Sequence, residues 1–290
     1  MHGFARLIKD AAVAWVDDAG SSMGAALAYY TLFSIAPLIL IVVSVAGLVF
    51  GEEASRGALV TQLSGFIGPD SAKGVEGLLQ HSSRPATGLI ASTVGVVTLL
   101  IGATSVVTEL QADLDRVWRA EPTGKTSNIV LFLQSRLLSF GLILALGFLL
   151  LVSLVMGAAL TAVGAWWASV LHGWGFVLQI ANVLLSFALS TVLFALIYKI
   201  LPRARIAWSD VWIGAAVTSA LFSVGKWLIS LYVGYAGIAS PFGAAGSVVL
   251  VMVWVYYSAQ IFVLGAEFTW LYAHAYGTRV GVDIPQAQVR

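Results

Sequence analysis

Two charged residues stand inside stretches of sequence that are otherwise apolar, and they are the first candidates for chemistry. Lys226 lies deep within one apolar block, and Glu267 lies in the Gly-Ala-Glu sequence of another. An ionised side chain in the middle of a bilayer costs about 2.5–3.5 kcal/mol on insertion scales, so each needs a partner or water. Lys226 could line a cavity and face an anionic substrate, or its side chain could extend to the outer surface past Tyr232 and Tyr235. Both interpretations stay open.

Glu267 also has two interpretations. It could bind a cation or act in gating, or it could belong to a structural clamp of charged residues near the inner ends of the apolar blocks, because carboxylates at helix ends commonly pair with arginine. The residues of this predicted clamp are Glu109, Asp115, Arg116, Arg119 and Arg136. The clamp is the favoured interpretation for Glu267.

Three uncharged residues complete the set of candidate cavity or gating residues: Tyr29, Pro37 and Gln260. Proline removes a helical hydrogen bond and leaves a carbonyl near Phe33 in need of a partner. Broken helices of this kind line many transport pathways, although a kinked packing helix is the commoner outcome. Gln260 can hydrogen-bond between helices in the membrane.

The residue types exclude several kinds of function. There is no cysteine, and the four histidines (His2, His81, His172 and His274) occur in no metal-binding spacing such as HExxH. The glycine-rich stretch 240–247 lacks the lysine of a phosphate-binding loop. The sequence contains no basic stripe with interleaved aromatic residues of the kind that would suggest nucleic-acid binding. We therefore expect no catalytic residues, no metal, no cofactor and no nucleic acid, and we predict that the chain is not an enzyme.

The elements that position these residues are long apolar helices. Of the 290 residues 59% are hydrophobic and only 10% are charged, whereas a soluble domain carries about 25% charged residues. About 20 apolar residues cross a bilayer as a helix, because backbone polar groups in lipid need partners within the segment. The sequence predicts an all-α membrane domain over 23–273 with six spans: 23–50, 89–108, 137–163, 176–200, 211–235 and 247–273.

Amphipathic segments surround these spans. Apolar residues recur at helical spacing in residues 1–22, which predicts a lead helix along the cytoplasmic interface with Trp15 at headgroup depth. Residues 51–88 predict an outer loop with short amphipathic helices, and residues 274–290 form a tail.

The lysines and arginines of the loops orient the domain. Eleven lie on the side of the two tails and three lie on the other side. Because positive charge is retained in the cytoplasm, both termini are predicted to be cytoplasmic, in a multi-pass protein of the bacterial inner membrane.

Four stretches, in order along the chain, resemble the YihY/BrkB family of bacterial inner-membrane proteins: AALAYYTLFSIAPLIL (25–40), LDRVW (114–118), LPRARIAWSDVWIGA (201–215) and FGAAGSVVLVMVWVYYSAQIFVLGAEFTWLY (242–272). The last is the most specific. The chain departs from the family pattern at Asp115, where Asn is usual, and at Phe242-Gly243, where Tyr-Gly is usual. The resemblance implies a six-helix membrane protein; members are linked to virulence, and some have been proposed to move lipids or solutes. An older ribonuclease label for the family finds no supporting residues here.

Together these features favour a transporter or lipid translocase, driven by a gradient or a partner protein, with membrane lipids as partners. The alternative is a membrane scaffold for envelope proteins that transports nothing. Whether the chain acts as a monomer or a homo-oligomer stays open.

Overall fold

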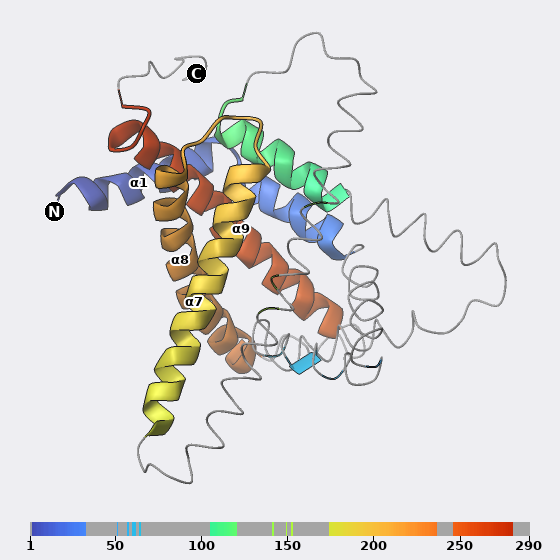
Figure 1. Cartoon of the computed structure of the whole chain (residues 1–290). Helices are drawn as coiled ribbons and strands as arrows, with labels where there is room; N and C mark the ends of the chain where they lie inside the picture. Colours follow the sequence, from blue (N-terminus) through green and yellow to red (C-terminus); the bar gives the residue numbers. More distant parts are fainter. Residues whose placement is uncertain are drawn as a thin grey trace.

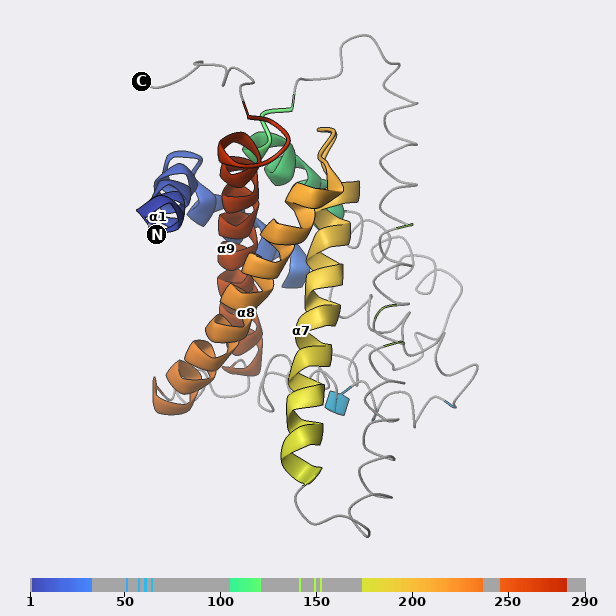
Figure 2. The same ribbon diagram turned by 60° about the vertical axis from the view of Figure 1, so that its left-hand side comes forward.

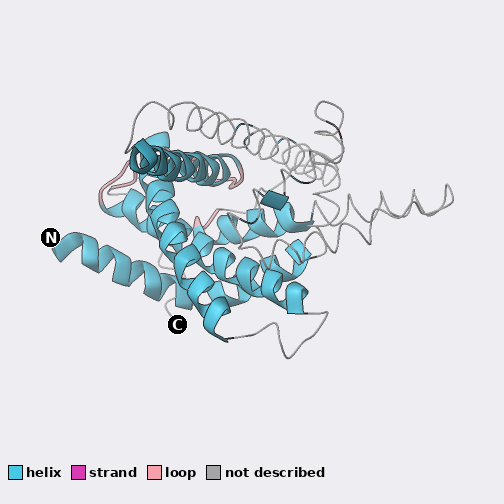
Figure 3. Cartoon of the chain, turned by 90° about the horizontal axis from the view of Figure 1, so that it is seen from below, coloured by secondary structure: helices cyan, strands magenta, loops and turns pink. Residues whose placement is uncertain are grey.

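The computed structural model describes residues 2–32, 105–120, 174–236 and 246–280, with a few isolated positions elsewhere. Within these ranges the regular structure is helical throughout, joined by short turns, and no strand occurs (Figure 3). The described part is therefore all-α. The predicted spans 23–50, 89–108 and 137–163 lie wholly or mainly outside these residues, as do Pro37, Arg136 and most of the outer loop 51–88.

Three long helices form the centre of the described structure: α7 (Trp174–Ile200), α8 (Trp208–Ala236) and α9 (Gly246–Ala275). Each contains a stretch that is long and apolar enough to cross a membrane, namely Gln179–Ile200, Trp208–Ile229 and Val251–Ala275. They occupy the stretches predicted as the fourth, fifth and sixth spans. α8 contacts both of the other helices (Figure 2).

A buried polar contact joins the three helices. The hydroxyl of Tyr198 in α7 donates to the carbonyl oxygen of Phe262 in α9 at 2.7 Å and lies 3.1 Å from Oγ1 of Thr218 in α8. Gly265 permits this approach, because a Cβ atom there would lie 2.0 Å from the same Oγ1 atom. In lipid, small residues and interhelical hydrogen bonds supply the attraction that the hydrophobic effect supplies in water.

The N-terminal segment is two helices. α1 (His2–Asp17) ends in a turn at which Ala19 has a φ of 57°, and residues 20–32 form a second helix. The buried side of α1 places Leu7 and Ala11 against Phe268 of α9. The ring of Trp15 packs against the central core and over Gly20, and its headgroup depth stays a prediction.

A further helix covers residues 105–117. The turn that follows it contains Arg119, which has a φ of 48°. It continues nine residues beyond the predicted end of the second span at 108. The reason is packing, since Leu114 and Val117 are buried in the same core as α7 and α9.

The basic segments gather at one end of the three long helices. α1, residues 105–120, the connection from α7 to α8 and the C-terminal end of α9 all lie there (Figure 1). We call this the basic end, because it carries the lysines and arginines of these segments: Arg6, Lys9, Arg116, Arg119, Lys199, Arg203, Arg205 and Arg279.

Candidate functional site

Glu267 is the most deeply buried carboxylate of the described residues. It lies in α9, within the candidate span Val251–Ala275, and its exposed fraction is 1%. The carboxyl group of Asp18, in the turn after α1, lies within hydrogen-bonding reach of it, and the opposing charge is the guanidinium of Arg119. Oε1 of Glu267 has no hydrogen-bond partner within the described part of the chain. Burial of a charge is costly unless it is paired and hydrogen-bonded, so this carboxyl group is incompletely satisfied.

The opposing cation is itself held by an aromatic ring. The guanidinium carbon of Arg119 lies 4.6 Å from the centre of the Trp270 ring, three residues beyond Glu267 on α9. Such cation–π contacts stabilise a guanidinium over an indole face. Among the described residues, Glu267 is therefore influenced by one carboxyl group and one guanidinium.

Gln260 lies two helical turns before Glu267, so both side chains project from the same face of α9. Its Nε2 atom donates to the carbonyl oxygen of Ser21 at 3.3 Å. Its Oε1 atom is buried and has no hydrogen-bond partner among the described residues. Gly24 allows the close approach, because a Cβ atom there would lie 2.3 Å from Nε2 of Gln260.

These residues define a polar seam between α9 and the segment that follows α1: Asp18 and Ser21 on one side, Gln260 and Glu267 on the other. Two of its acceptor oxygens, Oε1 of Gln260 and Oε1 of Glu267, lack a described partner. Two of the five predicted cavity or gating residues, Gln260 and Glu267, thus belong to the same seam. Asp18 had been missed, because 249 positions separate it from Glu267 in the sequence.

Tyr29 and Lys226 are two further predicted cavity or gating residues within the described helices. Tyr29 is 55% exposed, and its ring lies edge-on to Tyr30 at 5.7 Å. Lys226 is half-buried on α8. The preceding residue, Gly225, lets α8 approach Tyr257 and Ile261 of α9.

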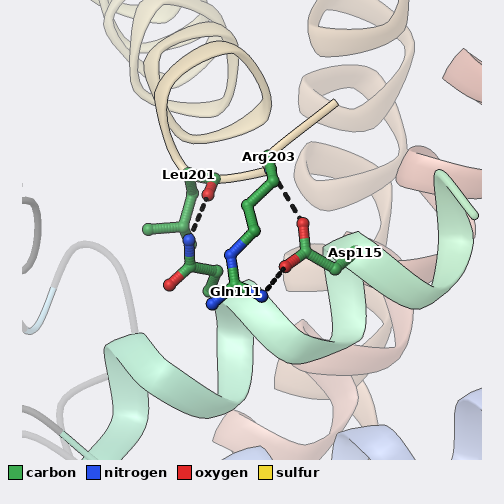
Figure 4. A network of polar contacts seen from close by, with 4 residues as sticks. All are labelled: Gln111, Asp115, Leu201 and Arg203. Atoms are coloured by element: carbon green, nitrogen blue, oxygen red, sulfur yellow. Dashed lines mark hydrogen bonds and ion pairs between the residues drawn. The ribbon is translucent and has the colours of Figure 1, made fainter. Parts of the chain in front are cut away.

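A second polar group lies at the basic end, and we call it the Asp115 cluster: Gln111, Asp115, Leu201 and Arg203 (Figure 4). Asp115 accepts the backbone N–H of Arg203 at 2.8 Å, and its Oδ2 atom lies 3.6 Å from Nη1 of the same arginine. Gln111 donates from Nε2 to the carbonyl oxygen of Leu201 at 3.0 Å. These contacts fasten helix 105–117 to the connection between α7 and α8.

The pKa values of two aspartates at the basic end follow from their surroundings. Burial raises the pKa of Asp115, while the hydrogen bond and the charge of Arg203 lower it. Burial and, less strongly, the nearby Glu109 raise the pKa of Asp113 to about 7, against the opposing effect of Arg116. Oδ2 of Asp113 has no described hydrogen-bond partner. Desolvation disfavours the charged form of any carboxyl group, so it dominates where pairing is incomplete.

The described members of the predicted clamp therefore belong to three separate groups of contacts. Asp115 pairs with Arg203, which the sequence analysis had not singled out. Arg119 lies at Glu267, and Glu109 and Arg116 act on Asp113.

Further polar contacts at the basic end hold the residues after α9. Thr278 donates to Asp210, from its backbone N–H at 3.2 Å and from its hydroxyl at 2.6 Å. Arg279 donates to the carbonyl oxygen of Arg205 at 2.8 Å, and its guanidinium carbon lies 5.2 Å from the centre of the Trp118 ring. The position of Asp210 in the first turn of α8 was the only sequence signal for this contact, since acidic residues favour helix N-termini.

No group of three or more histidine, cysteine or acidic side chains that could hold a metal ion occurs within the part of the chain that the structure describes.

An all-helical structure with three helices able to cross a bilayer, basic connections at one end and a buried carboxylate inside a span defines a polytopic membrane protein. The family model of the virulence factor BrkB matches residues 11–288. The chain belongs to this family, as its sequence motifs indicate.

Several curated membrane proteins are similar to the chain. A UPF0761 membrane protein of Pseudomonas aeruginosa is 28% identical over 87% of this chain and 59% of its own length. A UPF0761 membrane protein of Stenotrophomonas maltophilia is 25% identical, with 88% of this chain and 58% of the relative covered. One from Aeromonas salmonicida is 25% identical, with 84% and 80% covered. The chain thus spans about three fifths of the length of the Pseudomonas relative. No solved structure matches it.

Proposed function

We propose that this chain is a transporter or lipid translocase of the bacterial inner membrane, with six spans and both termini in the cytoplasm. The observation that carries the proposal is Glu267, a carboxylate that is 1% exposed inside a candidate span and has an oxygen without a described partner. Ionisable residues in the membrane interior are costly and mark substrate paths, ion paths or proton relays. The proposal includes no enzymatic reaction and no cofactor.

The orientation rests on charge. The described basic connections and the N-terminal helix share one end of the molecule (Figure 1), which supports a cytoplasmic location for that end under the positive-inside rule. In this orientation the polar seam lies near the cytoplasmic ends of the spans.

In the proposed mechanism the seam forms part of the path for a polar group. The Oε1 atoms of Gln260 and Glu267, which have no partner among the described residues, receive the group, and Lys226 on α8 attracts anionic parts of a substrate toward the membrane interior. A chain without a nucleotide-binding motif requires a gradient or a partner protein as its energy source.

A scaffold that organises envelope proteins is the second candidate, and the Asp115 cluster favours it. Its paired charges, together with the contacts of Asp210 and Arg279, fasten the segments of the basic end to one another. A fixed cytoplasmic platform of this kind suits a binding partner better than a moving gate.

The experiment uses purified full-length protein in vesicles that contain a trace of fluorescent phospholipid, with dithionite to bleach the outer leaflet. For a translocase we expect faster loss of the protected fluorescence than in empty vesicles. Glu267→Gln and Lys226→Met should each slow it about tenfold, which corresponds to about 1.4 kcal/mol in the barrier.

The matched control is Asp10→Asn, which removes a carboxylate that is exposed on α1 and pairs only loosely with Arg6 at 3.9 Å. It should leave the rate unchanged. Translocation no faster than in empty vesicles would reject the lipid translocase, and unchanged rates in both variants would reject the two residue assignments.

A further inference from the structure

α1 has an exposed apolar side next to its buried side. Leu7 and Ala11 face α9, whereas Ile8 and Val16 are 49% and 65% exposed. Ala12, midway between them, is also exposed. Residues four positions apart lie above one another on a helix, so Ile8, Ala12 and Val16 form one continuous stripe. We call it the α1 stripe.

The neighbours of the stripe on the helix surface are uncharged except for Lys9, three positions before Ala12. Around Ile8, the residues three and four positions away are Phe4, Ala5, Ala11 and Ala12. Val13 is just as exposed, at 51%, but it lies among Lys9, Asp10 and Asp17 on the polar side of the helix. The exposed surface of α1 is thus divided into an apolar side and a charged side.

The position of α1 gives the stripe a specific occupant. α1 lies beside the C-terminal part of α9 at the basic end, and α8 begins at the same end on the other side of α9 (Figure 2). There Trp208 and Trp212 are both exposed, with ring centres 6.2 Å apart, and Nζ of Lys199 lies 5.5 Å from the centre of the Trp208 ring. Exposed tryptophans with a nearby cation are typical of the headgroup level of a membrane. Because α1 lies at the same end of the long helices as these tryptophans (Figure 1), the headgroup level that they mark is also the level of α1.

We propose that α1 is an in-plane membrane helix, and that the α1 stripe inserts into the boundary between headgroups and acyl chains of the adjacent leaflet. The charged side with Lys9, Asp10 and Asp17 faces water. A helix with separate apolar and charged sides lies in this boundary with its apolar side about 5–10 Å deep. Ile8 and Val16 are the residues that enter the lipid, while Trp15 packs the helix against the protein core.

The natural absence of cysteine makes a direct test simple. Ile8→Cys, Val16→Cys and Val13→Cys are made one at a time in the full-length chain and labelled with a nitroxide. The proteins are reconstituted in vesicles of phosphatidylethanolamine and phosphatidylglycerol. Power-saturation electron paramagnetic resonance then compares collisions with oxygen, which concentrates in lipid, and with a water-soluble nickel chelate.

We expect oxygen to dominate at positions 8 and 16 and the nickel chelate to dominate at position 13, the matched control. Dominance of the nickel chelate at all three positions would overturn the proposal. Protection from both reagents at 8 and 16 would also overturn it, because a protein partner would then cover the stripe. Should Ile8→Cys fail to fold, Ala12→Cys on the same stripe replaces it, and the outcome does not depend on any transport activity.

Discussion

The polar seam contains a buried carboxylate and the Asp115 cluster a half-buried one, and the two carboxylates are satisfied to different degrees. Asp115 accepts a backbone N–H and pairs with the guanidinium of Arg203. Glu267 faces a second carboxyl group, and one of its oxygens has no described partner. Polar groups that hold a fold together are normally fully hydrogen-bonded, and each exception requires an explanation. We therefore propose a structural role for Asp115 and a functional role for Glu267.

The largest effect on stability is expected from Asp115→Ala. The substitution leaves the N–H and the guanidinium of Arg203 without their acceptor, and loss of a hydrogen bond to a charged group costs about 1.5–3 kcal/mol. The unfolding midpoint in detergent, followed by tryptophan fluorescence, should fall accordingly. A midpoint equal to that of the unaltered protein would show that the cluster contributes no stability. It would contradict the structural role of Asp115.

Asp113 provides an intermediate case on the same helix as Asp115. Its pKa is raised from its ordinary value of 3.8 to about 7, because burial and then Glu109 disfavour the charged form. The folded state therefore binds the proton more tightly than the unfolded state does. The resulting stability is fully present below pH 3.8 and is lost as the pH rises through about 7.

Asp113→Asn removes this titration. At pH 8 the variant should be more stable than the unaltered protein, and the difference should shrink as the pH falls toward 4. Unfolding midpoints of both proteins across this range measure the difference. A gap between the two that stays constant with pH would contradict the assigned pKa.

A smaller effect is expected from Gly24→Ala in the seam. The new methyl group meets only the flexible end of the Gln260 side chain, which can swing away at the cost of one weak hydrogen bond of about 1 kcal/mol or less. We expect a slight decrease of the unfolding midpoint. A large decrease would indicate that the seam is as tightly packed as the Asp115 cluster.

The sequence was sufficient to predict the long helices, because the length of an apolar stretch directly reflects the thickness of a bilayer. It also drew attention to Glu267 and Gln260, since polar residues inside such stretches are rare. It could not predict that Asp18 lies against Glu267 or that Arg203 pairs with Asp115. Those contacts depend on which helix faces meet, and close approaches at glycines such as Gly24 and Gly265 decide this.

Trp15 illustrates a different limit of sequence patterns. Tryptophan favours both the membrane interface and a protein core, and the two environments leave the same pattern in an amphipathic helix. The structure places Trp15 on the core side, and the nearby Gly20, which leaves room for its ring, was the only local sequence signal.

The most direct test of the account compares Glu267→Gln with Asp115→Asn, two substitutions that each replace a carboxylate by its isosteric amide. Both variants are measured for their unfolding midpoint in detergent and for phospholipid translocation in vesicles. The account predicts that Glu267→Gln keeps or raises the midpoint and slows translocation about tenfold, whereas Asp115→Asn lowers the midpoint and leaves translocation unchanged. A lowered midpoint with unchanged translocation in Glu267→Gln would contradict it, because Glu267 would then be a structural residue like Asp115.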